Sequence, residues 1–423
     1  APDEILWQAK PHIGTDKLPA VVKNIRERII SAGGEVRFLT RLADIELSGG
    51  AVCSVALEDS RTGARETVEA SRVIVACGHS ARDIFELARD RGFALERKPF
   101  SMGVRIEHPQ TLINRAQYGA AAKHTALGAA DYKMAVRVPA RANGTRTDAT
   151  SENATRGVYT FCMCPGGEVV CAASEPEGVV VNGMSRFARD GQNANSALLV
   201  GVGPEDFDGE DPLAGIKLQR EMEQAAYRTA IAAGGEPYQA PAQTVGDFLA
   251  HRAGGPSKQV KPTYARGVAW CDLHECLPPF VARAMDQALP QLDRRLHGFA
   301  DPQAVLTGVE TRSSSPVRIV RGKNMQAQLA AAPVSGCVQD EVLSPAQLVP
   351  APASSGTQDQ ARAKTQAAPE SSAAANRQPA DVAALEPETG LYPCGEGAGY
   401  AGGIMSAACD GLRVASALVE SLR

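Results

Sequence analysis

The stretch that decides the fold is Leu391-Tyr-Pro-Cys-Gly-Glu-Gly-Ala-Gly-Tyr-Ala-Gly-Gly-Ile404, a short apolar run followed by five glycines from Gly395 to Gly403. The Ala-rich residues after it predict a helix that continues to the C-terminus. Glycines this closely spaced let a backbone approach a flat, bulky ligand without obstruction by Cβ atoms. Free N–H groups at the start of the helix favour negative charge nearby. Glu396 is the only charged side chain in the loop, and it can accept hydrogen bonds from ligand hydroxyls.

The glycines also satisfy a dinucleotide-binding pattern, because Gly397-Ala-Gly-Tyr-Ala-Gly402 reads as G-x-G-x-x-G. A dinucleotide-binding unit needs a second strand after the helix, with an acidic residue about 20 residues further on. The sequence ends at Arg423 inside the predicted helix, so this second strand is missing. We therefore expect the stretch to be the closing motif of a flavoprotein rather than a pyrophosphate site. Reduced flavin has the hydroxyls and the negative charge that such a loop suits.

Five segments together resemble a large group of FAD-dependent dehydrogenases. The matching segments are Lys10-Pro-His-Ile-Gly-Thr-Asp-Lys17, Val73-Ile-Val-Ala-Cys-Gly-His-Ser80, Ser101-Met-Gly-Val-Arg-Ile-Glu-His-Pro109, Thr311-Arg-Ser-Ser-Ser-Pro-Val-Arg-Ile319 and Leu391 to Ile404. The resemblance implies an α/β fold, with a partial FAD-binding domain like that of glutathione reductase and an inserted α+β substrate domain. Members of the group open with a strand, a G-x-G-x-x-G loop and a helix. This chain has no such unit ahead of Ala1, which favours a truncated form.

Four regions follow from this interpretation. Residues 1–99 would form the first part of the FAD-binding domain, 100–325 the inserted substrate domain, and 389–423 the flavin motif with its helix. Residues 326–388 contain no Phe, Tyr or Trp and are rich in Ala, Gln, Pro and Ser. Such a composition buries too little apolar surface to offset chain entropy, so we expect a disordered insertion there.

Periodicity and turn residues predict the individual elements. We expect helices over 21–30 (capped by Thr15 or Asp16), 81–91, 215–232 and 277–296. We expect strands over 35–40, 43–47, 52–58, 66–69, 72–78, 101–107, 305–310 and 317–320, a hairpin of 158–164 with 168–172, and a surface loop over 141–156.

Two further places could contact the cofactor. The resemblance puts the end of the strand at Ala76, Cys77 and Gly78 close to the FAD; an ordinary strand-to-helix corner is the alternative. Arg312 offers a rigid fork for a carboxylate, a phosphate or the flavin edge, and a turn before a strand is the equally weighted alternative. The predicted cofactor-binding residues are Ala76, Cys77, Gly78, Arg312, Gly395, Glu396, Gly397, Ala398, Gly402, Gly403 and Ile404.

The cysteines indicate neither a disulfide framework nor a metal site. Ten in 423 residues is a low density, as in a reducing compartment. Cys271 and Cys276 have the C-x4-C spacing of a redox disulfide, but we favour two unrelated thiols. Cys162 and Cys164 would share a face of a hairpin near Cys171. A structural zinc site needs a fourth ligand, which is not evident, so we predict no metal.

The histidines show no metal-binding spacing either. His79 follows the strand beside the flavin and could lie near the cofactor or in a surface turn. His108 could face a substrate cavity. No catalytic acid or base can be named.

The overall charge narrows the choice of partners. A net charge of −4 and a pI near 6.1 argue against nucleic acid or an anionic membrane, and no apolar run reaches 18 residues. We predict an FAD-dependent oxidoreductase (dehydrogenase) that acts on a small molecule, with NAD(P)H as a candidate electron donor, in the cytoplasm or plastid stroma. The alternatives are a flavin-free interaction or scaffold protein and a flavin-dependent RNA-modifying enzyme. The oligomeric state is not predicted.

Overall fold

The glycine-rich stretch begins in a strand that pairs with a distant part of the chain. In the computed structural model, which describes residues 12–140, 155–207, 209–330 and 388–423, β16 (Leu391–Pro393) pairs in parallel with β4 (Val73–Val75). Leu391 and Val75 join a core that also contains Phe85 and Ile319. This pairing brings the two predicted flavin segments to the same edge.

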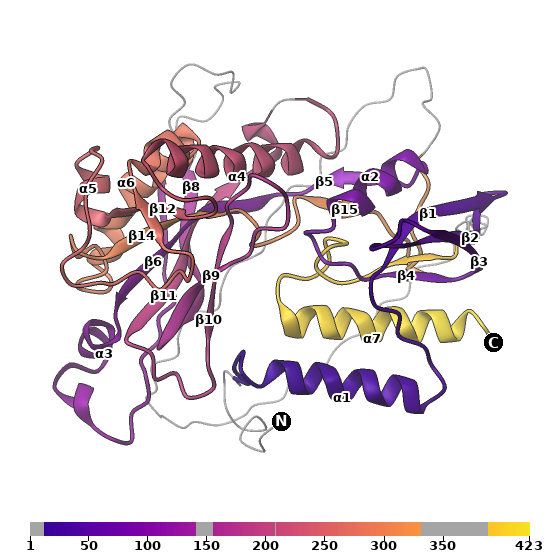
Figure 1. The fold of residues 1–423 in the computed structure, drawn as a ribbon, viewed down its shortest axis with the longest axis horizontal. Helices are drawn as coiled ribbons and strands as arrows, with labels where there is room; N and C mark the ends of the chain where they lie inside the picture. The colour runs from indigo at the N-terminus through magenta and orange to yellow at the C-terminus, as the bar shows by residue number, and fades with distance from the viewer. Residues whose placement is uncertain (1–11, 141–154, 208, 331–387) are drawn as a thin grey trace, which may run out of the picture. The chain divides into compact units, whose positions relative to one another are not determined.

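The elements around this pair come from residues 18–97, from residues 317–319 and from residues 404–420 (Figure 1). They are α1 (Leu18–Ser31), β1 (Thr40–Ser48), β2 (Ala51–Asp59), β3 (Arg65–Glu69), α2 (Arg82–Asp90), β5 (Leu95–Arg97), β15 (Val317–Ile319) and α7 (Ile404–Glu420). Strands β1, β2 and β3 form an antiparallel sheet in that order, and β15 pairs with β5. The helices predicted over 21–30 and 81–91 and the strands predicted over 43–47, 52–58 and 66–69 are confirmed.

Two local predictions in this region are wrong. Helix α1 has Lys17 as its N-cap and no side-chain cap, because Asp16 accepts a hydrogen bond from the Phe187 backbone N–H (2.8 Å) and Thr15 donates to the Ser185 carbonyl (3.2 Å). Residues 35–39 form no strand. Leu39 has a positive φ of 57°, which breaks the extended run before β1 begins.

A seven-stranded mixed sheet dominates residues 100–310, so the structure is a mixed α/β protein. Its order is β13-β12-β14-β6-β11-β8-β7, antiparallel except for the parallel pair β12 and β13. The strands are β6 (Phe100–Pro109), β7 (Ala135–Pro139), β8 (Thr155–Cys164), β11 (Asn193–Val202), β12 (Ala240–Thr244), β13 (Val268–Trp270) and β14 (Val305–Glu310). Central strands β6 and β11 are buried along nearly their whole length, which explains their apolar runs.

Helices pack against this sheet through their apolar stripes. Helix α6 (Pro279–Asp293) packs on β7, β8 and β11, and α4 (Ala214–Ala232) packs on β12, β13 and β14 (Figure 1). These two helices confirm the predictions for 215–232 and 277–296. The remaining elements are α3 (Gln110–Tyr118), α5 (Val245–Leu249), β9 (Gly167–Cys171), β10 (Val181–Ser185) and 3₁₀ helices at Gly119–Lys123, Pro204–Asp206 and Leu273–Glu275.

The predicted hairpin between β8 and β9 is wrong in its pairing. Strand β8 pairs with β7 and β11, whereas β9 pairs with β10 in a separate two-stranded sheet. The Pro165-Gly-Gly167 turn is present, but it leads the chain against residues 189–191, where the Gly191 N–H donates to the Gly166 carbonyl (3.2 Å). Cys162 has a positive φ of 42° and is exposed, whereas Cys164 is buried. The two thiols therefore do not share a face.

The predicted low-complexity insertion (326–388) lies mostly outside the described residues, as does most of the predicted loop over 141–156. The described start of the insertion has a defined position: Ala327 donates to the Leu391 carbonyl (2.7 Å), and Leu329 forms a bridge with Phe93. The domain boundaries expected near 99 and 325 stay predictions.

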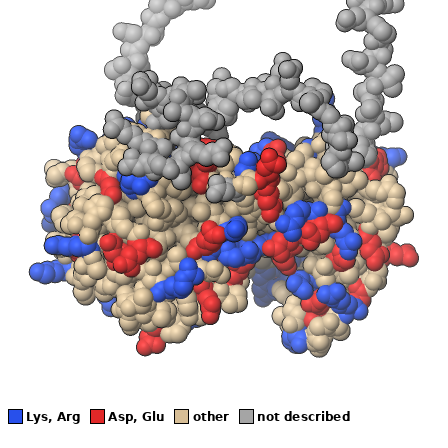
Figure 2. All heavy atoms as spheres, turned by 90° about the horizontal axis from the view of Figure 1, so that it is seen from above, with Lys and Arg blue, Asp and Glu red and all other residues tan. Residues whose placement is uncertain are grey.

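The surface mixes both signs of charge. On the face drawn in Figure 2, Lys and Arg side chains are interspersed with Asp and Glu. Among the described helices, none combines the length and the apolar character needed to cross a bilayer.

A buried carboxylate links the two regions of the described chain. Glu223 on α4 is 1% exposed and accepts hydrogen bonds from Arg82 on α2 (2.7 and 3.1 Å), from Arg312 (2.8 and 3.0 Å) and from the Thr311 hydroxyl (2.6 Å). Burial alone would raise the pKa of Glu223, but the Arg312 and Arg82 guanidiniums outweigh it and hold the pKa below its usual range. The carboxylate is therefore charged and surrounded by donors.

Replacing Glu223 with Gln should lower the free energy of unfolding by about 3 kcal/mol, because it leaves two buried guanidiniums without a counter-charge. Urea denaturation measures the change. The matched control is Glu221→Gln on the same helix, where an exposed carboxylate pairs only with Lys217 (3.9 Å) and the loss should stay below about 0.5 kcal/mol. Equal losses in the two variants would contradict a linking role for Glu223.

Candidate functional site

The end of β4 and the glycine-rich loop lie against each other. The Cys394 N–H donates to the Val75 carbonyl (2.9 Å), which continues the β4–β16 pairing into the loop. Beyond it, a Cβ on Gly397 would overlap the carbonyl of Gly78. Only glycine fits at Gly397 without displacing that carbonyl. The structure thus brings together two groups of predicted residues that are more than 300 positions apart in the sequence.

The loop is fixed on one side by polar contacts. Asp410 on α7 accepts from the Gly395 N–H (2.8 Å) and from Arg321 (2.6 Å). Arg321 also donates to the Pro393 carbonyl (2.9 Å) and lies over the Tyr400 ring (3.6 Å). Burial would raise the pKa of Asp410, but the hydrogen bonds from Arg321 and Gly395 lower it below its usual range. These contacts preorganise the loop backbone.

Gly399 is confined by the same framework. It has a φ of +87°, and its Cα faces the backbone of Val317 and Arg318, which a Cβ would crowd. The neighbouring Ala398 carbonyl accepts from the Ile319 N–H (3.3 Å). Ala398 therefore contributes its backbone to the fold of the loop, and β15 sets its position.

Three glycines near the loop, Gly78, Gly402 and Gly403, face open space. A Cβ at Gly78, Gly402 or Gly403 would meet no atom within 4 Å. Helix α7 then starts at Ile404, which is 73% exposed, and its first turn has no side-chain cap. Backbone N–H groups at a helix start without a cap are available to a ligand. The loop therefore has a packed side and an open side where a flat group can contact backbone.

Glu396 lies where several segments meet. Its Oε1 is 3.5 Å from His79 Nδ1, just after the β4 end. Burial raises the pKa of the Glu396 carboxyl, and the charge of Lys98 opposes that rise. Burial and the positive charge of Arg318 lower the pKa of Lys98 in turn. The side chain is half-buried and partly desolvated, which strengthens any hydrogen bond that it accepts.

Two thiols of the described chain have raised pKa values. Partial desolvation raises the pKa of the Cys162 thiol to about 11, although part of this residue's surface is exposed. Burial likewise raises the pKa of the Cys77 thiol to about 11. Both thiols are protonated at neutral pH and are not activated nucleophiles.

Arg312 is placed differently from the prediction of a free ligand-binding fork. Its Nε and Nη2 bind Glu223, and its Nη1 donates to the Ser174 hydroxyl. It still influences the site, since its charge acts with burial to lower the pKa of His79 to about 4. At neutral pH His79 is therefore an uncharged neighbour of Glu396.

Other predicted candidates belong to the packed interior. His108 is fully buried and its Nε2 lies 2.7 Å from the Phe299 carbonyl oxygen, so it does not face a substrate cavity. Cys271 and Cys276 are both buried free thiols that donate to separate carbonyls, of Ala269 and Leu273. Burial raises the pKa of each of these thiols.

Sequence reasoning missed Lys98. It lies next to the expected domain boundary, where the chain leaves β5 for β6, and its backbone N–H donates to the Pro316 carbonyl (2.9 Å). Its position beside the expected domain boundary near residue 99 is the sequence signal that could have identified Lys98.

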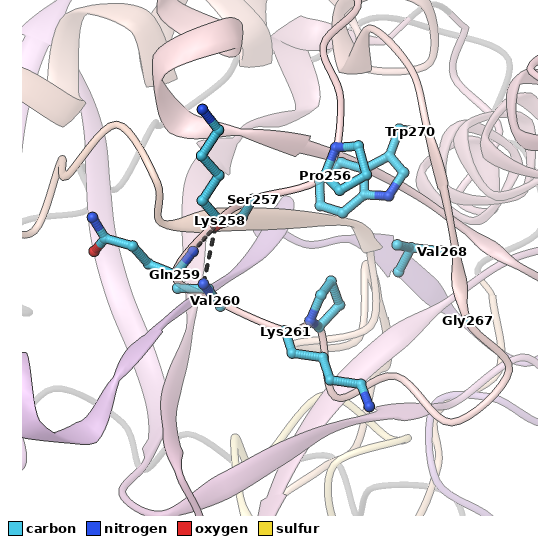
Figure 3. Close-up of a pocket in the computed structure, with 10 residues that line it drawn as sticks. Pro256, Ser257, Lys258, Gln259, Val260, Lys261, Gly267, Val268 and Trp270 are labelled. Carbon is cyan, nitrogen blue, oxygen red and sulfur yellow. Dashed lines mark hydrogen bonds between the residues drawn. The ribbon is translucent and has the colours of Figure 1, made fainter.

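A cavity of about 400 Å³ lies between residues 256 and 270 (Figure 3). It is lined by residues 256–262 with Gly267, Val268 and Trp270, and Lys258 and Lys261 are on its wall. The glycine-rich loop does not contribute to it.

Comparisons with known proteins identify the family of the chain. The family described as "FAD-dependent protein, C-terminal domain-like" matches residues 99–313, about half of the chain. The chain therefore belongs to this family of FAD-dependent proteins. The expectation of an FAD-dependent family, drawn from the sequence, is confirmed.

One relative and one solved structure add context. A Clostridium beijerinckii protein is 40% identical over 420 residues, which is 99% of this chain and 64% of that protein. The chain thus spans less than two thirds of this relative. The substrate-free form of the rebeccamycin biosynthetic enzyme REBC shares 14% identity, covering 42% of this chain and 24% of its own. Its TM-score of 0.18 is too low to indicate a shared fold.

Replacing Gly397 with Ala should destabilise the protein by about 1 to 3 kcal/mol, because the new methyl group forces the loop away from the Gly78 carbonyl. Gly402→Ala adds the same methyl group into open space, and the free energy of unfolding should change by less than about 1 kcal/mol. Urea denaturation of both variants tests this difference. A Gly397→Ala protein as stable as Gly402→Ala would show that the close approach is not needed.

His79 should make stability depend on pH. Its pKa is about 4 when folded and about 6.5 when unfolded, so between these values the unfolded chain binds a proton that the folded chain does not. Stability should therefore fall as the pH falls from 6.5 to 4, by on the order of 3 kcal/mol from this group. His79→Asn should remove that part of the slope in urea denaturation at several pH values. The exposed His124→Asn should keep it, and an unchanged slope in His79→Asn would contradict the assignment.

Proposed function

We propose that the chain forms the flavin-ring side and the substrate cover of an FAD-dependent oxidoreductase. The observation that carries this proposal is the two-sided loop, with Gly397 packed on Gly78 and with Gly402 and Gly403 facing open space. A rigid, polar backbone surface free of Cβ atoms fits a flat ring system. Membership of a family of FAD-dependent proteins supports the choice of ring.

Different residues of the loop would bind different parts of the flavin. Glu396 would accept hydrogen bonds from the hydroxyls of the ribityl chain, since its carboxylate is half-buried and close to Lys98. The N–H groups at the start of α7, from Gly403 and Ile404, would favour negative charge on the pyrimidine edge of the ring. Bound flavin supplies the electron or hydride transfer. Its tendency to accept electrons would rise in this environment.

The inserted region would cover the ring and select a small-molecule substrate. Strand β15, which follows β14 of the seven-stranded sheet in the sequence, lies against Gly399 of the loop, so the end of this region is available at this edge. His79 is uncharged at neutral pH and could contact a substrate without adding charge to the site. NAD(P)H remains a candidate electron donor, and dehydrogenation is the reaction type we favour.

The ADP half of FAD needs a second binding surface. None of the residues of α1 is buried, and α7 exposes Ile404, Met405 and Leu412. Exposed apolar faces of this kind indicate that more protein packs there. The Clostridium relative is longer than the chain, and we propose that the part beyond the match supplies the pyrophosphate site.

Flavin titration tests the proposal. FAD and riboflavin are added to the purified chain, and binding is followed by flavin fluorescence and calorimetry. Glu396→Gln and Gly402→Ala should each weaken riboflavin and FAD by the same factor, about tenfold for Glu396, because both ligands share the ribityl chain. The affinity for ADP should not change. The control is Glu420→Gln, an exposed carboxylate at the other end of α7, which should bind as the unmodified chain does.

Two outcomes would overturn the proposal. Full riboflavin affinity in both variants would mean that the loop does not contact the flavin. The longer Clostridium relative, purified at full length without visible flavin absorption bands, would favour the flavin-free scaffold. We expect the 423-residue chain alone to bind FAD weakly, and submicromolar affinity would contradict the need for a second surface.

A further inference from the structure

Three potential metal ligands meet at a place to which the glycine-rich loop contributes no residue. His251 follows α5, His274 lies in the 3₁₀ turn Leu273–Glu275, and Asp286 is on α6. Asp286 Oδ2 is 3.4 Å from His251 Nε2 and 3.5 Å from His274 Nε2. Their ligand atoms all lie within 4.8 Å of one another.

The surroundings orient His274 for coordination. Its Nδ1 is 2.7 Å from Asp272 Oδ1, so the proton on this nitrogen is donated to a carboxylate and Nε2 faces Asp286. A carboxylate behind the ring nitrogen is the usual partner of a metal-binding histidine. His274 Nε2 and Asp286 Oδ1 are buried and have no hydrogen-bond partner among the described residues. Buried polar atoms without partners are rare and costly, which indicates a missing ligand.

The spacing of the ligand atoms suits a tetrahedral ion. Zinc bonds of roughly 2.0–2.1 Å at a tetrahedral angle separate neighbouring ligand atoms by about 3.4 Å. The two distances from Asp286 Oδ2, 3.4 and 3.5 Å, match that separation, and the two histidine nitrogens lie within 4.8 Å of each other. An octahedral ion at similar bond lengths would need about 3.0 Å.

The segments that carry the ligands are held together by a fully buried amide. Gln243 on β12 accepts from the Leu273 N–H (3.0 Å) and donates to the Arg252 carbonyl (2.7 Å). It thereby fixes the residues next to His274 and next to His251. The Phe248 ring stacks on His274 with 4.3 Å between the ring centroids. The site is therefore preorganised before any ion binds.

We propose that His251, His274 and Asp286 bind a divalent zinc ion, with water as the fourth ligand. His251 is 60% exposed, so the ion would be accessible from solvent. Two imidazoles and a carboxylate are ligands that zinc accepts in sites with an open position. This ion would be a second cofactor, independent of the flavin.

Titration of the metal-free chain with Zn²⁺ tests the proposal. Calorimetry should give about one equivalent of Zn²⁺, and each of His251→Ala, His274→Ala and Asp286→Asn should weaken binding by more than about tenfold. Bound Co²⁺ should give the intense visible absorption of a four-coordinate ion, and Asp286→Asn should lose it. The control is His297→Ala, which removes another exposed histidine and should bind Zn²⁺ as the unmodified chain does.

Circular dichroism checks that each variant is folded. If His274→Ala does not fold, His251→Ala carries the test, because this exposed side chain can be shortened without opening the core. Absence of Zn²⁺ binding, or binding that Asp286→Asn and His251→Ala leave unchanged, would overturn the proposal. Failure of the flavin experiments would not affect it, since neither readout involves flavin.

Discussion

The candidate site depends on the close approach of Gly397 to the carbonyl of Gly78. Strand β16 pairs in parallel with β4, and this contact holds the two chain segments together after the strands end. It places Glu396 beside His79 and leaves Gly402 and Gly403 facing open space. A side chain at Gly397 would separate the two segments and remove the flat backbone surface.

Glu223 also joins segments that are far apart in the sequence. It gathers Arg82 from the region of the β4–β16 pair and Arg312 from the end of the seven-stranded sheet. The charges are mutually satisfied, so none of the three is free to bind a ligand. Burial, together with the charges of Arg312 and Arg82, lowers the pKa of His79, which connects the structural network to the electrostatics of the loop. Removing one partner from such a buried network destabilises the fold, whereas the complete network favours one arrangement of the segments.

Much of the fold could be predicted from the sequence, and the failures have tertiary causes. Periodicity predicted α4 and α6 because their apolar faces lie on the sheet. It failed for 35–39, where the positive φ of Leu39 breaks the extended run before β1 begins. Arg312 was predicted as a ligand fork because Glu223, 89 positions away, is invisible to local patterns. The cluster of His251, His274 and Asp286 was missed for the same reason, since its members show no motif spacing. The glycine-rich loop was predictable because its chemistry is concentrated in one continuous segment.

Helix α7 has a consequence for regulation. Among its described residues, only Asp410 and Val414 are buried, and Asp410 holds the Gly395 N–H. Val414 packs with Tyr392 and Cys394, so α7 is joined to the start of the loop by an apolar contact as well as by this hydrogen bond. Binding of a molecule to the exposed face of the helix would then be thermodynamically coupled to ligand binding at the loop. Each ligand would change the affinity of the other by the same factor.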